Sequence, residues 1–465
     1  MTHTSRKIFL LAFSGVIAAS AACSDYLQVV NPSAVDVEKL SDSTNANLLV
    51  NGAIAEFQTM WGVATQYGSL FSDESQNGHV NISFILVDAR NFTDQLDINR
   101  LLYSPIQRSR FAGDTVATLL TRYEGPAAAG ADARVARMLA LAGMSMVVLG
   151  ENYCSAPIAG GAPMTPAELF AATLPKFDSA ITIGRAAAAA AVAATPPRSR
   201  ASADSITNLA LVGAARASLN MGDYAKAISY ASQVPSTFSA YRVYYSEGIP
   251  TTPGLPVNPV WGDMGSPTAS TAANGTSVSG GFNYVAGGLW LVMSTKFETI
   301  TDPRMPHTPT RVRGMNANNF FVANKPISYG GYVPPSTALP GGTAMTPGAS
   351  IRIASFKEAQ YIIAEANQGN AVTLAFVNQE RAANGMTPST AVTPAEVLAD
   401  LRDQRRREFY LDNHRVGDMR RYLSQYNVDE WPSGAYPNSA NPTYGTLTCF
   451  PLPNTETNSN PNARP

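Results

Sequence analysis

Residues 404–421 read QRRREFYLDNHRVGDMRR, a segment in which guanidinium and carboxylate groups alternate. The ladder of opposite charges, with members three or four residues apart, consists of Arg405, Glu408, Asp412, Arg415 and Asp418. At about 100° per residue, the first four side chains would share an arc of about 80° on a helix. Opposite charges at this spacing form hydrogen-bonded ion pairs along a helix face. The spacing therefore predicts a structural charge ladder that begins on a helix expected over residues 394–411.

A catalytic role for the same carboxylates is the alternative, because glycosidases use a pair of acidic residues. Glu408 and Asp412 would then act as acid and base. The flanking arginines would keep both carboxylates ionised, however, whereas a general acid must carry its proton. We therefore favour the structural role, and we expect His414 to be a packing residue within the ladder.

Helical periodicity extends over much of the remaining chain. Apolar residues recur at helical spacing through residues 131–150, which predicts a buried helix. Another helix is expected after Thr165, which can cap it, with Pro166 at its first position. This helix would continue into the alanine run 186–194 and end before the prolines that follow.

Small residues lie on one face of the predicted helices 208–217 and 225–232, which permits close antiparallel packing. A similar unit recurs in residues 353–366, 372–383 and 394–411. Paired helices of this kind are typical of tetratricopeptide repeats. The sequence thus predicts a mostly α fold with a tetratricopeptide-like helical-repeat scaffold, and generic helical hairpins are the alternative.

Residues 235–350 are rich in Gly, Pro, Ser, Thr and Asn, with scattered aromatic residues. A connection of this length without structure is uncommon inside a compact protein. We expect a large loop-rich insertion that contains a few short strands. Residues 60–110 have a similar composition and are expected to be loop-rich as well.

The N-terminal residues resemble a secretory signal. Arg6 and Lys7 precede an apolar stretch that ends at Cys23 and is too short to span a bilayer. Residues 20–23 read SAAC and resemble a lipobox, although Ser20 stands where leucine is usual. We expect residues 1–22 to be removed and Cys23 to be lipidated, with plain secretion as the alternative. Because no later apolar run approaches the length of a spanning helix, the lipid would be the membrane anchor.

Charge and cysteine content narrow the possible partners and the compartment. Removal of residues 1–22 leaves 31 Lys and Arg against 34 Asp and Glu, a net charge of about −3 that argues against nucleic acid. Charged residues make up 14% of the chain, so the polar surface comes largely from uncharged groups suited to neutral polar ligands. In an oxidising compartment, Cys154 and Cys449 are expected to form a disulfide, and two separate buried thiols are the alternative.

Residues 404–421 resemble the C-terminal signature of SusD/RagB proteins, which runs Arg-x-x-Glu-Leu, an acid and Gly, then Arg-x-x-Asp-Leu-x-Arg. Residues 449–453 (CFPLP) and 460–462 (NPN) resemble the closing segments of that family. Weaker matches are Ala364-Glu365-Ala366, Asn378-x-x-Arg381, Asp302-Pro303-Arg304 and the start Cys23-Ser24-Asp25-Tyr26-Leu27. Departures from the family pattern are Gln404 and Asp412 for Glu, Asn413 for Gly, and Ser355 for Arg.

The resemblance implies a function that the residue patterns alone do not show. SusD-like proteins are surface-exposed outer-membrane lipoproteins that bind a glycan or similar nutrient and deliver it to a TonB-dependent SusC-like transporter. After the signal 1–22, residues 23–465 would form a single domain. Its helical scaffold would comprise residues 24–234 and 351–465, and residues 235–350 would be the ligand-facing insertion.

A glycan site needs aromatic platforms together with planar polar groups. We expect residues 61–103 and the insertion to meet on one exposed face and to form such a site, although any one of the aromatic residues could instead be core. The candidate ligand-binding residues are Trp61, Tyr67, Asp73, Asn77, Asn91, Arg100, Asn283, Tyr284 and Trp290. Phe71, Gln76 and Tyr103 belong to the same segments.

No enzymatic motif supports catalysis. The sequence contains no HExxH, CxxC, P-loop or GxSxG pattern, and His79, His307 and His414 are far apart. We expect no enzyme activity, cofactor or metal site, although loop Asp and Asn residues leave calcium open without EF-hand spacing. The other functions to be tested are a helical-repeat scaffold that binds only protein and a surface glycan hydrolase.

Overall fold

The computed structural model describes residues 42–78, 81–245, 258–260, 291–307, 312–313, 322–323, 348–437 and 443–464. The predicted signal sequence and Cys23 lie outside these residues, as do Asn283, Tyr284 and Trp290. The chain divides into two units, Met1–Asn45 and Ala46–Pro465. The first contributes the short 3-10 helix η2 (Ser43–Asn45), and the second contains every other described element.

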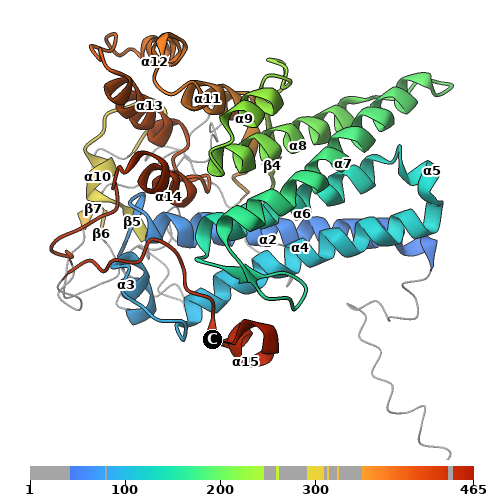
Figure 1. Ribbon diagram of the computed structural model, residues 1–465, viewed down its shortest axis with the longest axis horizontal. Helices are drawn as coiled ribbons and strands as arrows, with labels where there is room; N and C mark the ends of the chain where they lie inside the picture. Colours follow the sequence, from blue (N-terminus) through green and yellow to red (C-terminus); the bar gives the residue numbers. More distant parts are fainter. Residues whose placement is uncertain are drawn as a thin grey trace, which may run out of the picture. The chain divides into compact units, whose positions relative to one another are not determined.

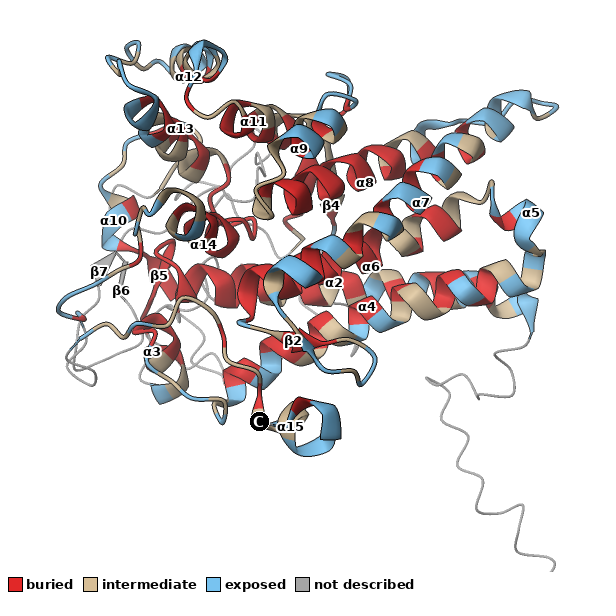
Figure 2. Cartoon of the chain, viewed as in Figure 1, coloured by how far each residue is buried: buried red, intermediate tan, exposed pale blue. Residues whose placement is uncertain are grey.

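Long helices of the second unit pack in the order of the sequence. Each helix contacts the next one in this series, and Figure 1 shows the long members lying side by side. The series consists of α2 (Ala46–Phe71), α4 (Asp97–Glu124), α6 (Ala133–Asn152), α7 (Pro166–Ala193), α8 (Ala201–Asn220) and α9 (Tyr224–Ala231). Figure 2 shows buried residues concentrated along α6 and α8. Sequential packing of paired helices confirms the predicted helical-repeat scaffold.

Small residues allow α6, α7 and α8 to approach one another closely. A Cβ atom added at Gly213 of α8 would lie 2.5 Å from Phe177 of α7, and one at Gly143 of α6 would lie 2.8 Å from the same ring. Phe177 is fully buried and fills the space that the two glycines leave. The start of α7 matches its sequence signal, because Thr165 and Glu168 form a capping box around Pro166.

A second helical group follows the insertion and comprises α11 (Phe356–Ala366), α12 (Ala371–Ala383), α13 (Pro394–Glu408) and α14 (Arg415–Tyr426). Helix α11 packs on α8 and α9, and α14 packs on α2 and α6, so α11 and α14 contribute to the core of the first group. Residues of α12 and α13 belong to a smaller separate cluster. The helix predicted over residues 394–411 ends at Glu408. Leu411 and Asn413 have φ angles of 54° and 68°, which break the helix before α14 begins.

Short antiparallel strand pairs connect distant segments. Strand β1 (Ser75–Asn77) pairs with β5 (Leu291–Met293), and β4 (Ala240–Val243) pairs with β8 (Ile351–Ser355). The remaining pairs are β2 (Ala156–Pro157) with β3 (Pro163–Met164), and β6 (Val312–Arg313) with β7 (Val322–Ala323). The other short helices are α3 (Ile82–Asp88), α5 (Pro126–Ala129), α10 (Thr295–Glu298), α15 (Asn454–Ser459) and the 3-10 helix η5 (Pro461–Ala463). The insertion therefore contains short strands, as expected.

Two expectations from the sequence were wrong. Residues 60–110 are not mainly loops, because α2 continues to Phe71 and α4 begins at Asp97. Helix α6 also has the length and hydropathy of a membrane span, although no later run of that kind was expected. Within that apolar window 78% of residues are buried inside the protein, which makes α6 a core helix.

A disulfide joins Cys154 to Cys449, the pair that the sequence favours. Beside it, the backbone N–H of Cys154 donates to Phe450 O, and Phe450 N–H donates to Asn152 O. The ring of Phe450 packs against Phe71 and Tyr153 in the core. The C-terminal tail is thereby held against the end of α6.

Candidate functional site

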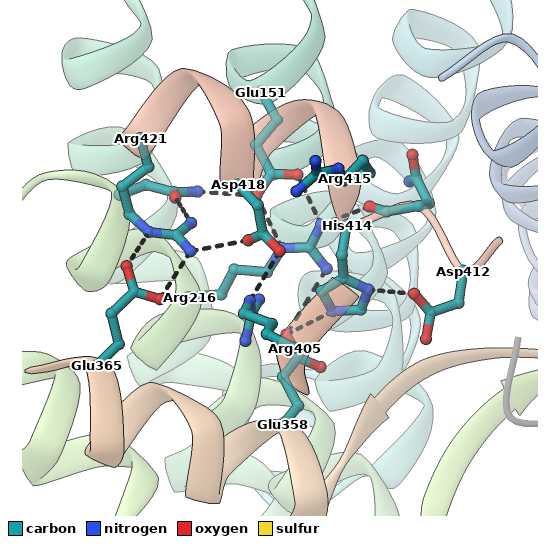
Figure 3. A network of polar contacts seen from close by, with 12 residues as sticks. Glu151, Arg216, Glu358, Glu365, Arg405, Asp412, His414, Arg415, Asp418 and Arg421 are labelled. Atoms are coloured by element: carbon teal, nitrogen blue, oxygen red, sulfur yellow. Dashed lines mark hydrogen bonds and ion pairs between the residues drawn. The ribbon is translucent and has the colours of Figure 1, made fainter. Parts of the chain in front are cut away.

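The charge ladder forms a buried network rather than one face of a helix. Its members pair mainly with residues from other elements, because the chain turns between α13 and α14. Arg352 of β8 donates to Glu408 and Asp412, and Arg405 donates to Asp418 at 2.8 Å. The network also includes Arg421 with Glu365 and Arg216 with Glu151 (Figure 3). The charged side chains are buried and ion-paired, and the predicted single helical face is wrong.

His414 lies at the centre of this network and is 1% exposed. Its Nδ1 is 2.7 Å from Asp412 Oδ1, and its Nε2 is 3.0 Å from Glu358 Oε1. Burial and the nearby Arg216 oppose protonation, but the two carboxylates outweigh them and raise the pKa of His414 above its ordinary value. His414 is thus a buried residue that contacts two carboxylates, as expected of a packing residue within the ladder.

Arg415 extends the network to the end of α2. Its Nε and Nη2 donate to the two oxygens of Asp73 at 2.6 and 2.7 Å, and its Nη1 is 2.9 Å from Glu430. Lys296 of α10 also contacts Asp73. Burial favours the neutral acid, but Arg415 and Lys296 outweigh it and hold the pKa of Asp73 well below its usual value. Asp73 is therefore an oriented, ionised carboxylate.

Asp73 lines a cavity of about 300 Å³, which we call the Trp431 cavity. It lies where the end of α2, strand β1, the start of α10 and the segment after α14 meet. The lining residues are Ser72, Asp73, Ser75, Gln76, Asp88, Ser294, Thr295, Lys296, Glu430, Trp431, Pro432, Ser433, Ala435, Pro437 and Tyr444. The β1–β5 pairing brings residues 75–77 and 291–293 together beside this cavity.

Two lining residues carry polar atoms that lack a hydrogen-bond partner among the described residues. These atoms are Gln76 Oε1, an acceptor, and Trp431 Nε1, a donor. Gln76 is 3% exposed and Trp431 is 6% exposed. An unpaired buried polar atom costs about 1–3 kcal/mol, so a ligand or water that pairs with these atoms would be stabilised. One hydroxyl-rich ligand can supply both the donor and the acceptor.

Arg90 and Phe71, which are not among the lining residues, pack against the aromatic residues that line the cavity. The Arg90 guanidinium lies 5.2 Å from the centroid of the Trp431 ring and 6.0 Å from that of Tyr444. Phe71 packs edge-on against Trp431 at 5.4 Å between centroids. These contacts hold the indole in place, and pre-positioned aromatic groups are what a sugar face requires.

Asp88 gives the cavity a titratable group near neutral pH. Burial raises the pKa of Asp88 to about 7, and hydrogen bonds from Asn77 N–H and the Tyr436 hydroxyl limit the rise. Both donors contact Oδ2, at 2.8 and 2.7 Å. Asp73 and Asp88 therefore have pKa values shifted in opposite directions on one cavity wall.

The other candidate residues occupy different positions. Trp61 is fully buried in α2 and donates from Nε1 to Arg352 O at 3.1 Å, so it is a core residue. Tyr67 packs against Phe84 in the core, and Asn77 is buried in β1. Asn91 and Arg100 are exposed, outside the residues that line the cavity. The expectation that Trp61 and Tyr67 of α2 form aromatic platforms was wrong, because helix packing turns these rings inward.

The sequence analysis did not identify Trp431, Tyr444 or Lys296. Trp431 precedes Pro432 in the polar segment between the charge ladder and the closing CFPLP motif. A tryptophan in such a segment is a signal that could have been used, because large aromatic residues in loops are often held for binding. Lys296 has no comparable signal, since its position depends on the β1–β5 pairing.

Comparison with known proteins identifies the architecture. A model described as the SusD family matches residues 358–463. A SusD superfamily protein from Bacteroides vulgatus has a TM-score of 0.60 at 14% identity, over 90% of this chain and 98% of that chain. Surface glycan-binding protein A from Bacteroides uniformis has a TM-score of 0.59 at 12% identity, over 90% and 98% of the two chains. This chain has a SusD-like fold.

A SusD-like carbohydrate-binding protein from Bacteroides fragilis is also similar, with a TM-score of 0.56 at 14% identity over 92% of this chain and 100% of that chain. No curated protein sequence matches the chain. The family-model match and the similar structures confirm the resemblance to the SusD/RagB family. Within the SusD-like fold, Trp431 and Tyr444 belong to the residues matched by the family model, whereas Asp73, Gln76 and Lys296 precede them.

Proposed function

We propose that this protein is a surface-exposed outer-membrane lipoprotein that captures a glycan or similar nutrient in the Trp431 cavity. It would deliver this ligand to a TonB-dependent SusC-like transporter. The SusD-like fold supports the proposal, as do similar structures described as glycan-binding and carbohydrate-binding proteins. The predicted signal 1–22 and lipidation of Cys23 would place it at the cell surface.

The observation that carries the proposal is that two residues lining one cavity, Gln76 and Trp431, each have a buried polar atom (Oε1 and Nε1) without a hydrogen-bond partner among the described residues. A sugar hydroxyl both donates and accepts, so neighbouring hydroxyls can pair with each atom. Lys296 is already neutralised by Asp73, and Asp73 is also held by Arg415. With its charges paired internally, the cavity favours a neutral sugar.

The arrangement also supports the proposed domain organisation. Ser294, Thr295 and Lys296 come from the segment 235–350, which we propose as the ligand-facing insertion. The remaining lining residues come from the ends of α2 and α3, from β1 and from the segment after α14. We propose that residues 23–465 act as one domain, with the helical scaffold holding these segments together.

The opposed pKa shifts of Asp73 and Asp88 also favour a second function to be tested, glycan hydrolysis. Asp73 is held by two cations, however, and Asp88 is itself buried and hydrogen-bonded. We propose binding without bond cleavage. The purified protein should release no reducing ends from a polysaccharide that it binds, and product formation abolished by Asp88→Asn would establish hydrolysis instead.

Binding is tested by calorimetry with a panel of neutral oligosaccharides against the mature chain. Trp431→Phe keeps an aromatic ring but removes the indole donor, and Gln76→Met removes the amide acceptor at similar volume. Each variant should weaken binding at least about 5-fold, because one hydrogen bond is worth about 1 kcal/mol. Lys226→Ala, an exposed lysine on α9, is the control and should bind normally. Unchanged affinity in both cavity variants would refute the placement of the site.

Anchoring and partnership need separate experiments. Cys23→Ala should release the protein from the membrane fraction, and surface protease should digest the wild type in intact cells. A barrel transporter should co-purify with the wild type from detergent extracts. If the protein co-purifies with the barrel transporter but binds no glycan, it would be a protein-interaction scaffold rather than a nutrient-binding protein.

A further inference from the structure

A second cavity lies on another part of the scaffold, about 20 Å along α2 from the Trp431 cavity at about 1.5 Å per residue. We call it the Arg137 cavity, and its volume is about 270 Å³. It lies where α2, α6 and α8 meet the strand pair β4–β8, which packs on α8 (Figure 1). The lining residues are Ile54, Phe57, Gln58, Arg137, Leu141, Ser205, Ala240, Tyr241, Arg242, Val243, Tyr244 and Ile353.

The charge of this cavity is one-sided. Arg137 of α6 and Arg242 of β4 both line it, and none of the described lining residues is an acid. Arg242 already donates from Nη1 to Ser350 O and Ser350 Oγ, whereas Arg137 has fewer hydrogen bonds among the described residues. Burial and the neighbouring Arg352 lower the pKa of Arg242. Both guanidinium groups that line the cavity would attract an anion that enters it.

Arg137 also has unused hydrogen-bonding capacity. Its Nη2 donates to Ser202 Oγ at 3.0 Å, but its Nε is buried without an acceptor among the described residues. A guanidinium presents donors in a planar fork that matches the two oxygens of a carboxylate. In the same structure, Arg415 uses its Nε and Nη2 in this way to hold Asp73.

The walls of the cavity suit a ring. Phe57, Leu141 and Ile353 form an apolar floor and are buried or half-buried. Tyr241 is half-buried, and Tyr244 is 65% exposed at the rim. The Gln58 side chain donates to Tyr244 O at 3.1 Å, which ties the rim to α2. A ring can lie against these surfaces while a charged substituent reaches Arg137.

We propose that the Arg137 cavity is a second binding site, which takes a small ligand with a carboxylate on a six-membered ring. Such a ring is present both in acidic sugars and in aromatic acids, and the two share the same carboxylate chemistry. The site is independent of the Trp431 cavity, because the two have no lining residue in common.

Calorimetry on the mature chain tests the proposal with glucuronate, glucose and benzoate as probes. Binding that depends on Arg137 should be seen with glucuronate but not with glucose if the ligand is an acidic sugar, and with benzoate if it is an aromatic acid. Arg137→Gln should weaken binding of the active probe at least about 10-fold. The affinity of Arg137→Lys should lie between those of Arg137→Gln and the wild type, because lysine keeps the positive charge but lacks the planar pair of guanidinium donors.

Arg122→Gln is the matched control, because it removes one positive charge from an exposed position on α4. Its affinity for the active probe should equal that of the wild type. Thermal unfolding should show that Arg137→Gln is folded. The proposal would be overturned if neither acid bound at millimolar concentration, or if folded Arg137→Gln bound the acids as tightly as the wild type. It would also be overturned if Arg137→Gln weakened the binding of glucose as much as that of glucuronate.

Discussion

Replacing Arg415 with methionine should destabilise the protein by about 3 kcal/mol at pH 7. Arg415 is 3% exposed and donates two hydrogen bonds to Asp73, which is also 3% exposed at its side chain. Removing the guanidinium leaves a buried carboxylate, and breaking a buried pair in this way costs about 3–5 kcal/mol. Lys296 still contacts Asp73 from a half-exposed position, which places the expected cost at the lower end of that range.

The pH dependence of this loss follows from the pKa of Asp73. Its folded-state pKa lies below the ordinary value of 3.8, so the pair stabilises the fold above that pH. The contribution is lost as the pH falls through the folded-state value. The difference in the free energy of unfolding between wild type and Arg415→Met should therefore have its full value from pH 7 down to about pH 5, and it should shrink at lower pH.

Urea denaturation followed by circular dichroism measures this difference, and Arg108→Met is the matched control. Arg108 pairs with Glu56 at 3.1 Å, but the side chains are 58% and 40% exposed, so its loss should cost less than about 1 kcal/mol. In the double variant Asp73→Asn/Arg415→Met, the two losses should not add, because the buried charge is gone. A cost for Arg415→Met no larger than that of the control would refute the network as a stabilising element of the site.

Other perturbations test the scaffold. Gly213→Val should cost about 1–3 kcal/mol or more, because even its Cβ would meet the Phe177 ring at 2.5 Å, and a lowered midpoint in urea would show this. The double variant Cys154→Ser/Cys449→Ser should lose up to about 4–5 kcal/mol of unfolding free energy, since the disulfide closes a loop with a separation of 295 residues. Equal melting temperatures of reduced and oxidised wild type would contradict this. The raised pKa of His414 means that its contribution is full below about pH 6.5 and is lost as pH rises through the folded-state value, so the stability deficit of His414→Gln should shrink between pH 6 and pH 9. A deficit that grows with pH over this range would show that His414 is neutral in the fold.

Several features of this protein follow from local sequence. Thr165 and Thr393 each precede a proline and are followed three residues later by glutamate, and both start helices through capping boxes. Such signals lie within one helical turn, so they require no knowledge of the rest of the chain. The SusD/RagB resemblance likewise depends on residues 404–421 and 449–462, whose order and spacing are visible in the sequence.

Tertiary structure alone decided which charges pair and which aromatic rings line a cavity. The ladder spacing predicted one helical face, but the break at Leu411 and Asn413 directs Arg415 toward Asp73, 342 residues earlier. Trp61 and Trp431 are both buried, but only Trp431 is among the residues that line the Trp431 cavity. Burial and ion pairing depend on groups brought together from distant parts of the chain, and their free energies are therefore absent from any local pattern.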